Sequence, residues 1–142
     1  MLTIHYEACK DIKQSLKYVR SIGLKAGIAL KPQTPLDVID EEIIELVDVV
    51  HLMTVEPGLE GQKFLWDSIG RISDLKNRIK KTGDHKYIEV DGGINIHNVC
   101  DVVRAGANVI VSGKALFDGN LKNNIMNMAD ALAAVEVEAL RF

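Results

Sequence analysis

The chain has 142 residues, of which 47% are hydrophobic and 26% charged, and its formal net charge is −3. This composition is typical of a globular protein and not of a disordered one, and the small negative charge disfavours a nucleic-acid partner. No apolar run reaches the ~20 residues of a membrane span, and no basic and apolar leader opens the chain. We therefore expect a single cytoplasmic domain over residues 1–142, with no membrane partner.

Short apolar segments of strand length alternate with stretches whose apolar residues lie three and four positions apart, which is the spacing of amphipathic helices. In chain order, the first predicted elements are a strand at 2–6, a helix from Ile12 to Gly23, a strand at 26–30, a helix at 36–46 and a strand at 47–53. They are followed by a helix from Leu65 to near Gly83, a strand at 87–90, a helix capped by Asn95 and ended by Gly106, a strand at 108–112 and a final helix. The final helix is expected to bury Leu121, Ile125, Met128, Leu132 and Val135.

Repeated βα units with short connections predict a parallel sheet with right-handed crossovers. The strand around Val109 to Val111 is apolar on both faces, as parallel strands covered by helices are. Two architectures fit this pattern, an open doubly wound sheet and a barrel. A doubly wound sheet usually carries its glycine-rich loop after the first strand, and no such loop follows Tyr6, so the pattern favours the barrel.

Three glycine-rich loops follow the third, fourth and fifth predicted strands, at 56–62, 91–93 and 112–114. Glycine lets the backbone approach a ligand closely and direct N–H groups at it. In eight-stranded barrels, the loops after the last two strands and a short extra helix commonly hold a phosphate, and a helix that starts at Lys114 or Ala115 would match. Asp91 ends a strand where barrels carry catalytic groups, although it could also simply cap the turn that follows.

Residues 53–64 resemble the signature loop of the ribulose-phosphate 3-epimerases. Residues 90–94 and 105–113 are similar to the next two signatures of that family, residues 5–8 to its fourth strand, and residues 27–32 to its fifth. The resemblance extends over essentially the whole chain. It implies strands four to eight of a parallel (β/α)8 TIM barrel, in which about five βα units are present and the first three strands are missing.

The resemblance implies an isomerase of carbohydrate metabolism, in the pentose phosphate pathway, that interconverts D-ribulose 5-phosphate and D-xylulose 5-phosphate at carbon 3. In this family two carboxylates exchange the proton beside the ketone, and a divalent metal holds the enediolate charge. Zinc or iron is expected, with manganese or cobalt as further options. Asp91 matches a carboxylate that is both a metal ligand and an acid/base group, and Met53 matches a residue of the pocket floor. The positions that match substrate- and phosphate-binding residues are Gly58, Leu59, Glu60, Gly61, Asp91, Gly92, Gly93, Gly113 and Lys114.

The missing strands carry the other carboxylate, two histidine ligands and a serine of the family. No histidine here replaces them with ligand spacing: His51 is expected in the core or the barrel wall, His85 and His97 in a loop and near a helix start, while His5 could face the pocket. Because each acid/base group contributes about 10²–10⁴ in rate, we expect this chain alone to be nearly inactive. Five strands cannot close an eight-stranded barrel, so exposed edges favour a homo-oligomer or other association through them.

Two residues depart from the family pattern. Glu60 stands where the family has a small residue, and Lys114 where it has serine or another small polar residue. The two could pair across the phosphate site, or both could point to solvent. Two other functions also remain open, a non-catalytic remnant that binds sugar phosphates and an epimerase of a hexulose 6-phosphate. Aldol-type or decarboxylase chemistry on a related barrel is disfavoured by the match at 53–64.

Overall fold

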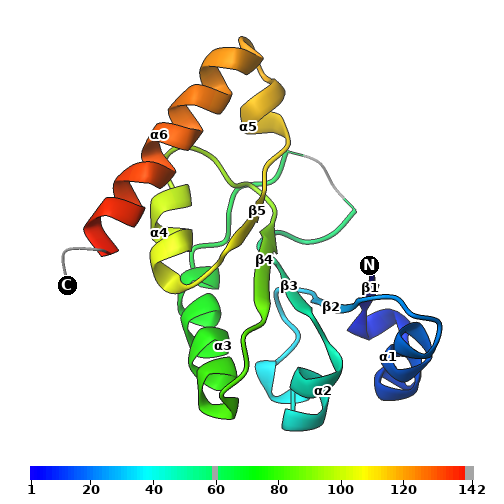
Figure 1. Ribbon diagram of the computed structural model, residues 1–142. Helices are drawn as coiled ribbons and strands as arrows, with labels where there is room; N and C mark the ends of the chain where they lie inside the picture. Colours follow the sequence, from blue (N-terminus) through cyan, green and yellow to red (C-terminus); the bar gives the residue numbers. More distant parts are fainter. Residues whose placement is uncertain (59–60, 140–142) are drawn as a thin grey trace.

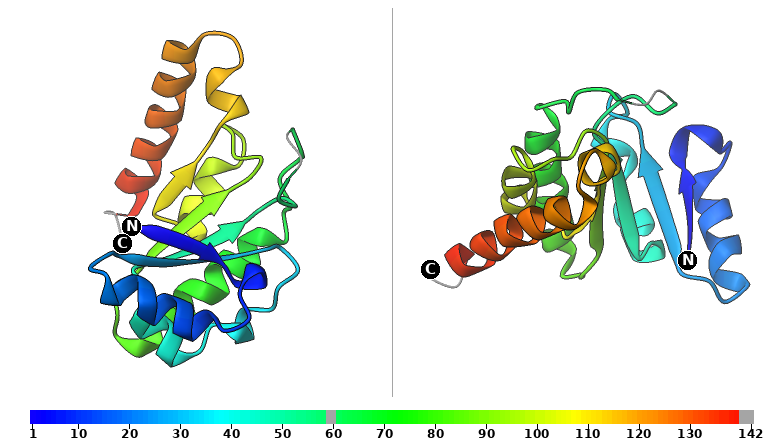
Figure 2. Two further views of the ribbon diagram at one scale, coloured as in Figure 1. Left: turned by 90° about the vertical axis from the view of Figure 1, so that its right-hand side faces the viewer. Right: turned by 90° about the horizontal axis from the view of Figure 1, so that it is seen from above.

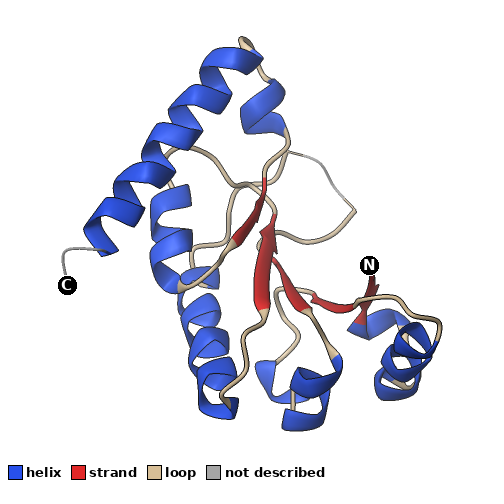
Figure 3. Cartoon of the chain, viewed as in Figure 1, coloured by secondary structure: helices blue, strands red, loops and turns tan. Residues whose placement is uncertain are grey.

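The computed structural model describes residues 1–58 and 61–139, which form one parallel sheet with helices packed against it (Figure 1). The five strands are β1 (Leu2–His5), β2 (Ala26–Leu30), β3 (Val49–Met53), β4 (Tyr87–Asp91) and β5 (Val109–Val111). The helices are α1 (Ile12–Ser21), α2 (Glu41–Leu46), α3 (Ser68–Thr82), α4 (Val99–Ala105), α5 (Lys114–Phe117) and α6 (Leu121–Ala139), with short 3-10 turns η1 (Tyr6–Ala8) and η2 (Leu36–Val38). Figure 3 shows the alternation of strand and helix along the chain.

The strand order is β1-β2-β3-β4-β5, so each strand pairs with the one that precedes it in the sequence. Because crossovers between parallel strands are right-handed, an order that never reverses places all the connecting helices on one face. A doubly wound sheet would reverse its order in the middle. The predicted α/β fold is therefore confirmed, and the sheet has the order of a section of a barrel wall. The first and last helices, α1 and α6, lie at opposite ends of the sheet (Figure 2).

The two faces of the sheet differ in character. On one face Ile4, Ile28, Val50 and Ile88 lie side by side, and all but Ile4 are fully buried. They belong to a core shared with apolar helix residues, among them Leu16, Ile43, Ile72 and Leu75. The opposite face carries a row of mixed polar and apolar residues, namely His5, Ala29, His51, Glu89 and Val109. One face thus supplies the packing, and the other is open to polar groups.

Three helix starts differ from the sequence predictions, each because a side chain or a backbone bond intervenes. The helix predicted at 36–46 is divided into η2 and α2, since Asp40 caps α2 by accepting a hydrogen bond from the Ile43 N–H at 2.9 Å. Helix α3 starts at Ser68 and not at Leu65, whose N–H donates to the Thr54 carbonyl at 3.0 Å.

The third difference concerns α4, which begins at Val99, after Asn98 and not after Asn95. The Asn98 side chain turns back and accepts a hydrogen bond from the Asn95 N–H at 2.9 Å, so it does not cap the helix. The bounds of every strand were predicted to within two residues, and the largest difference is in β3, which begins at Val49 and not at Val47.

The final helix buries only part of its predicted stripe. Met128 and Val135 are buried, but Leu121 and Ile125 are 42% and 48% exposed. Helix α6 packs on α4 and α5, and no described element covers its first turns on the side of these two residues. The prediction that they are core residues is therefore wrong. None of the helices in the described ranges is both long and apolar enough to span a membrane.

Candidate functional site

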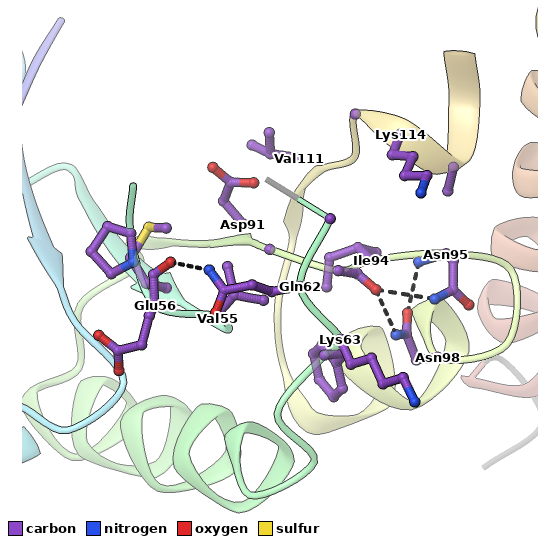
Figure 4. A pocket seen from close by; sticks show the side chains of 18 of the residues that line it. Val55, Glu56, Gln62, Lys63, Asp91, Ile94, Asn95, Asn98, Val111 and Lys114 are labelled. Carbon is purple, nitrogen blue, oxygen red and sulfur yellow. Dashed lines mark hydrogen bonds between the residues drawn. The ribbon is translucent and has the colours of Figure 1, made fainter. Parts of the chain in front are cut away.

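The three glycine-rich loops meet at the carboxyl ends of β3, β4 and β5, where they surround a pocket of about 1360 Å³ (Figure 4). Because the strands are parallel and adjacent, their carboxyl ends share one edge of the sheet. The predicted site residues that line this pocket are Met53, Gly58, Gly61, Asp91, Gly92, Gly93, Gly113 and Lys114. Leu59 and Glu60 lie outside the described residues, and with them the predicted pairing of Glu60 and Lys114. The sequence thus predicted which segments come together, while the role of each residue stays a prediction.

Asp91 is the last residue of β4 and lies between Met53 and Val111 of the neighbouring strands in the register of the sheet. All three residues line the pocket, and Figure 4 shows the Asp91 carboxylate beside Val111. The carboxylate accepts no hydrogen bond from any other residue that the structure describes. It is therefore available to a ligand in the pocket.

The donors around Asp91 do not by themselves form a metal centre. Within residues 1–58 and 61–139, no three His, Cys, Asp or Glu side chains lie close enough together to hold a metal ion. A catalytic zinc site takes about three protein ligands, and Asp91 offers one carboxylate beside the weakly binding sulfur of Met53. A divalent ion at Asp91 would need further donors, so no chemical step through a metal follows from this set of residues.

Cationic and amide groups gather on one side of the pocket. Lys63 and Lys114 both line it, and Figure 4 shows them on either side of Asn95 and Asn98. Lys114 is the first residue of α5 and follows the N-cap Gly113. An anionic group is favoured near these ammonium groups, because opposite charges attract more strongly where water is partly excluded. Lys63 and Asn98 were not predicted as site residues, although Lys63 stands within the signature loop.

Aromatic side chains also line the pocket, which sequence reasoning did not anticipate. The Phe64 and Trp66 rings meet edge to face with their centroids 5.3 Å apart, and both line the pocket. Trp66 and Phe117 are exposed, and Phe117 also lines the pocket. Their position depends on how the loops fold, and single aromatic residues in a loop carry no periodic signal.

The histidines are placed as follows. His51 lies in the sheet, where its Nδ1 is 2.8 Å from Glu89 Oε1 and its Nε2 is 3.2 Å from Met53 Sδ, which confirms the expected place in the wall. His5 does not line the pocket, and its Nδ1 lies 3.2 Å from Glu7 Oε2. His97 lines the pocket, which its sequence position had not indicated.

Glu7 connects the loops that follow β1 and β2. Its carboxylate accepts hydrogen bonds from the Lys31 N–H at 2.9 Å and from the Thr34 hydroxyl. Burial acts to raise the pKa of Glu7, but the hydrogen bonds from Thr34 and Lys31 outweigh it, and the pKa lies below its usual value. Arg71 of α3 donates to the Lys31 carbonyl at 3.2 Å, and partial burial lowers the pKa of its guanidinium.

Comparison with known proteins gives the family. The model of the ribulose-phosphate 3 epimerase family matches residues 1–117. A ribulose-phosphate 3-epimerase of Escherichia coli (strain K12) is 34% identical over 139 residues, which are 97% of this chain and 61% of that protein. The ribulose-phosphate 3-epimerase of Bacillus subtilis is 39% identical over 118 residues, covering 82% of this chain and 54% of the relative. A chloroplastic ribulose-5-phosphate-3-epimerase of Arabidopsis thaliana is 39% identical over 119 residues, covering 82% of this chain and 42% of the relative.

The chain thus spans about 61% of the bacterial relative that it matches over the longest stretch, and less of the other two. The matched region includes all three glycine-rich loops and Asp91. Because the family model matches most of the chain and the relatives match along most of its length, the chain belongs to the ribulose-phosphate 3 epimerase family.

Proposed function

We propose that the pocket at the ends of β3, β4 and β5 binds a ketose 5-phosphate, and that Asp91 exchanges a proton at carbon 3 of the bound sugar. The reaction is the interconversion of D-ribulose 5-phosphate and D-xylulose 5-phosphate. The observation that carries the proposal is the sharing of one pocket by an unpaired carboxylate, three glycine-rich loops and two lysines. The names of the relatives support the choice of substrate.

The chemistry asked of Asp91 is general acid/base catalysis. The hydrogen at carbon 3 is acidic because it lies beside the ketone, and a carboxylate within hydrogen-bond reach can remove it or return it. Inversion needs a second acid/base group on the opposite face of the substrate. The predicted site supplies one such group in this chain, and about 10²–10⁴ in rate depends on each. We therefore propose that the chain alone binds the sugar phosphate but turns it over very slowly.

A non-catalytic sugar-phosphate-binding protein is the second candidate. It is favoured by the observation that no group of three metal-binding side chains lies within the described residues. Asp91 would then be at most one ligand of a divalent ion whose other donors come from elsewhere. An epimerase of a hexulose 6-phosphate would use the same pocket, and a comparison of pentulose and hexulose phosphates as ligands separates the two substrate classes.

The test is exchange of solvent deuterium into carbon 3 of D-ribulose 5-phosphate, followed by NMR together with ligand binding, with and without added zinc or iron. We expect binding with exchange only slightly above the rate without protein. Asp91→Asn should bring the exchange down to that rate, while Asp130→Asn, which alters an exposed carboxylate of α6 that does not line the pocket, should leave it unchanged. Turnover at the rate of a complete enzyme would contradict the proposed near-inactivity, and absence of binding would contradict the proposed ligand.

We also propose that the protein acts in the cytoplasm, makes no contact with membranes or nucleic acids, and associates through the open edges of its sheet. The negative formal charge supports the proposed absence of a nucleic-acid partner. One relative is named as chloroplastic, so not every member of the family acts in the cytoplasm.

A further inference from the structure

Three polar side chains are buried in the described part of the chain, namely Thr54, Ser68 and Asn98, which are 0%, 4% and 2% exposed. A buried polar group is unfavourable unless it forms hydrogen bonds, so each such residue calls for a structural reason. Two of the three, Thr54 and Asn98, bond to the same short turn, residues 91–93, one at its start and the other at its end.

Thr54 follows β3 and holds the first part of the turn. Its N–H donates to the Asp91 carbonyl at 2.8 Å. Its hydroxyl oxygen lies 3.0 Å from the Asp91 carbonyl oxygen and 2.6 Å from that of Gly92, so its one hydrogen is shared between these two acceptors. The carbonyls of two consecutive residues are therefore fixed by a single side chain and its own backbone.

Asn98 precedes α4 and holds the last part of the turn. Its Nδ2 donates to the Gly93 carbonyl at 3.0 Å, and Asn95 Nδ2 donates to the same oxygen, also at 3.0 Å. The other side-chain atom of Asn98, Oδ1, accepts from the Asn95 N–H, so its amide group is used on both sides. All three carbonyls of the turn are thus bound by groups of the protein.

Fixing the carbonyls also fixes the amide groups. In a trans peptide plane the carbonyl of one residue and the N–H of the next point in opposite directions. The carbonyls of Asp91, Gly92 and Gly93 are directed at Thr54 and Asn98, which are buried side chains. The N–H groups of Gly92, Gly93 and Ile94 therefore point the other way, and these residues line the pocket.

The turn itself needs such support. Gly92 and Gly93 have φ angles of 123° and 67°, which L-residues rarely adopt. Because glycine has the greatest conformational freedom of all residues, two consecutive glycines could also adopt many other backbone conformations. External hydrogen bonds select one of these conformations.

We propose that Thr54 and Asn98 are positioning residues, which clamp the turn at 91–93 so that three successive amide groups form a preorganised site for an anionic oxygen of the ligand. The bound oxygen belongs to a phosphate or to an enolate that develops during reaction, since both are favoured by converging N–H donors. This role in ligand binding rests on the proposed function, whereas the clamp itself does not. Asn98, which precedes α4, and Thr54, which follows β3, thus both hold the turn in place.

Matched variants test the clamp. Thr54→Val keeps the shape and removes the hydroxyl, and Thr54→Ser restores the hydroxyl. Asn98→Asp keeps the shape and removes the Asn98 donor to the Gly93 carbonyl, while the Asn95 donor remains. Ser68→Ala is the control, because Ser68 is the third buried polar residue and makes no side-chain hydrogen bond to the turn. The probes are D-ribulose 5-phosphate and inorganic phosphate, with affinities measured by calorimetry.

We expect Thr54→Val and Asn98→Asp to weaken D-ribulose 5-phosphate binding by about tenfold or more, because each removes a buried hydrogen bond. Thr54→Ser and Ser68→Ala should stay within about twofold of the wild type. Equal affinities across the four variants would overturn the proposal, and so would a loss of affinity in Ser68→Ala as large as that in Asn98→Asp. If Thr54→Val does not fold, Asn98→Asp and Thr54→Ser carry the same comparison from the two ends of the turn.

A ligand-free measurement keeps the clamp separate from the proposed function. The amide NMR signals of Gly92 and Gly93 should shift and broaden in Thr54→Val and Asn98→Asp, and stay in place in Thr54→Ser and Ser68→Ala. If the wild type binds no sugar phosphate, the proposed function fails, and the clamp is still judged by these signals. Unmoved signals in both Thr54→Val and Asn98→Asp would overturn the clamp, whatever the chain binds.

Discussion

Asp91 illustrates how one residue serves two purposes at the edge of the sheet. Its carbonyl accepts hydrogen bonds from the N–H and hydroxyl of Thr54, so its backbone is held in place. Its carboxylate lines the pocket without a hydrogen bond from another described residue. A fixed backbone with a free side chain is the arrangement that acid/base catalysis needs, because the proton must be exchanged with a ligand and not with a neighbour.

Gly93 has no room for a side chain. A Cβ there would lie 2.6 Å from Phe64 N and 2.9 Å from Phe64 Cα, which are backbone atoms that cannot move alone. We expect Gly93→Ala to lower the free energy of unfolding by about 1–3 kcal/mol or more. Gly70→Ala is the matched control, because Gly70 lies in α3 with open space around it, and there alanine should stabilise by about 0.5–1 kcal/mol. Denaturant unfolding measures both, and changes of the same sign would contradict this account.

Glu7 makes stability depend on pH in the acid range. Its pKa is lowered from 4.5 in the folded state, so the folded protein binds fewer protons at this group than the unfolded chain. Its contribution to stability is fully present above 4.5 and is lost as the pH falls through the lower folded pKa. Glu7→Gln should therefore make the fall of unfolding free energy with acidification less steep. Urea unfolding at pH values above and below 4.5 measures the slope, and equal slopes for both proteins would refute the prediction.

At the scale of the elements, the sequence pattern predicted the strands better than the helix ends. Apolar runs such as 26–30 are strands in the structure with the same bounds, because a parallel strand is apolar on both faces and short. The division of the helix predicted at 36–46 depends on a single capping bond of Asp40, which periodicity does not register. The exposure of Leu121 and Ile125 could not be predicted either, since a pattern shows which face is apolar and not what covers it.

For the site, too, the sequence predicted the position better than the detailed contacts. Glycine-rich loops after parallel strands predicted where a ligand would be bound, because strand direction alone brings those loops together. The use of Thr54 could not be predicted, since its hydrogen bonds depend on the tertiary placement of a turn 37 and 38 residues away in the sequence. The Asn98 side chain bonds locally, to Gly93 and Asn95, whereas the sequence predicted Asn95 as the cap of the helix. The Phe64 and Trp66 pair was missed because single aromatic residues in a loop carry no periodic signal.

Helix α6 offers a matched pair of methionines. Met128 is 9% exposed and belongs to the hydrophobic core, whereas Met126 is 53% exposed. Met128→Ala should lower the free energy of unfolding by about 2 kcal/mol or more, because it removes buried methylene groups and leaves a cavity. Met126→Ala should change it by about 0.5 kcal/mol or less. Urea unfolding of the two variants decides the matter, and equal losses would show that α6 does not pack on α4 as described.

The molecule as a whole ends in two open strands. Strands β1 and β5 each have one paired neighbour in the described sheet. Large apolar side chains are exposed near both, with Leu2 and Val111 on the strands and Leu121 and Ile125 on α6. Unpaired strand edges and exposed apolar surface both favour association.

We therefore expect the chain to associate in a concentration-dependent way. Ile125→Lys should shift it toward the monomer, because a charge on the exposed face of α6 is unfavourable to bury in an interface. Ile96→Lys is the control, since Ile96 is 41% exposed but lies in the loop before α4 and not on α6. Sedimentation velocity over a range of concentrations provides the measurement. A monomer at every concentration, or the same shift in both variants, would contradict the expectation.

The unbroken strand order also has a consequence for how the chain folds. Each strand pairs only with the strand that precedes it, so no pairing in the sheet closes a loop longer than one βα unit. Loop closure is the slow step for sheets built from distant segments, and short closures favour rapid folding. Each pairing of the described sheet can thus form as soon as the βα unit that joins its two strands is complete.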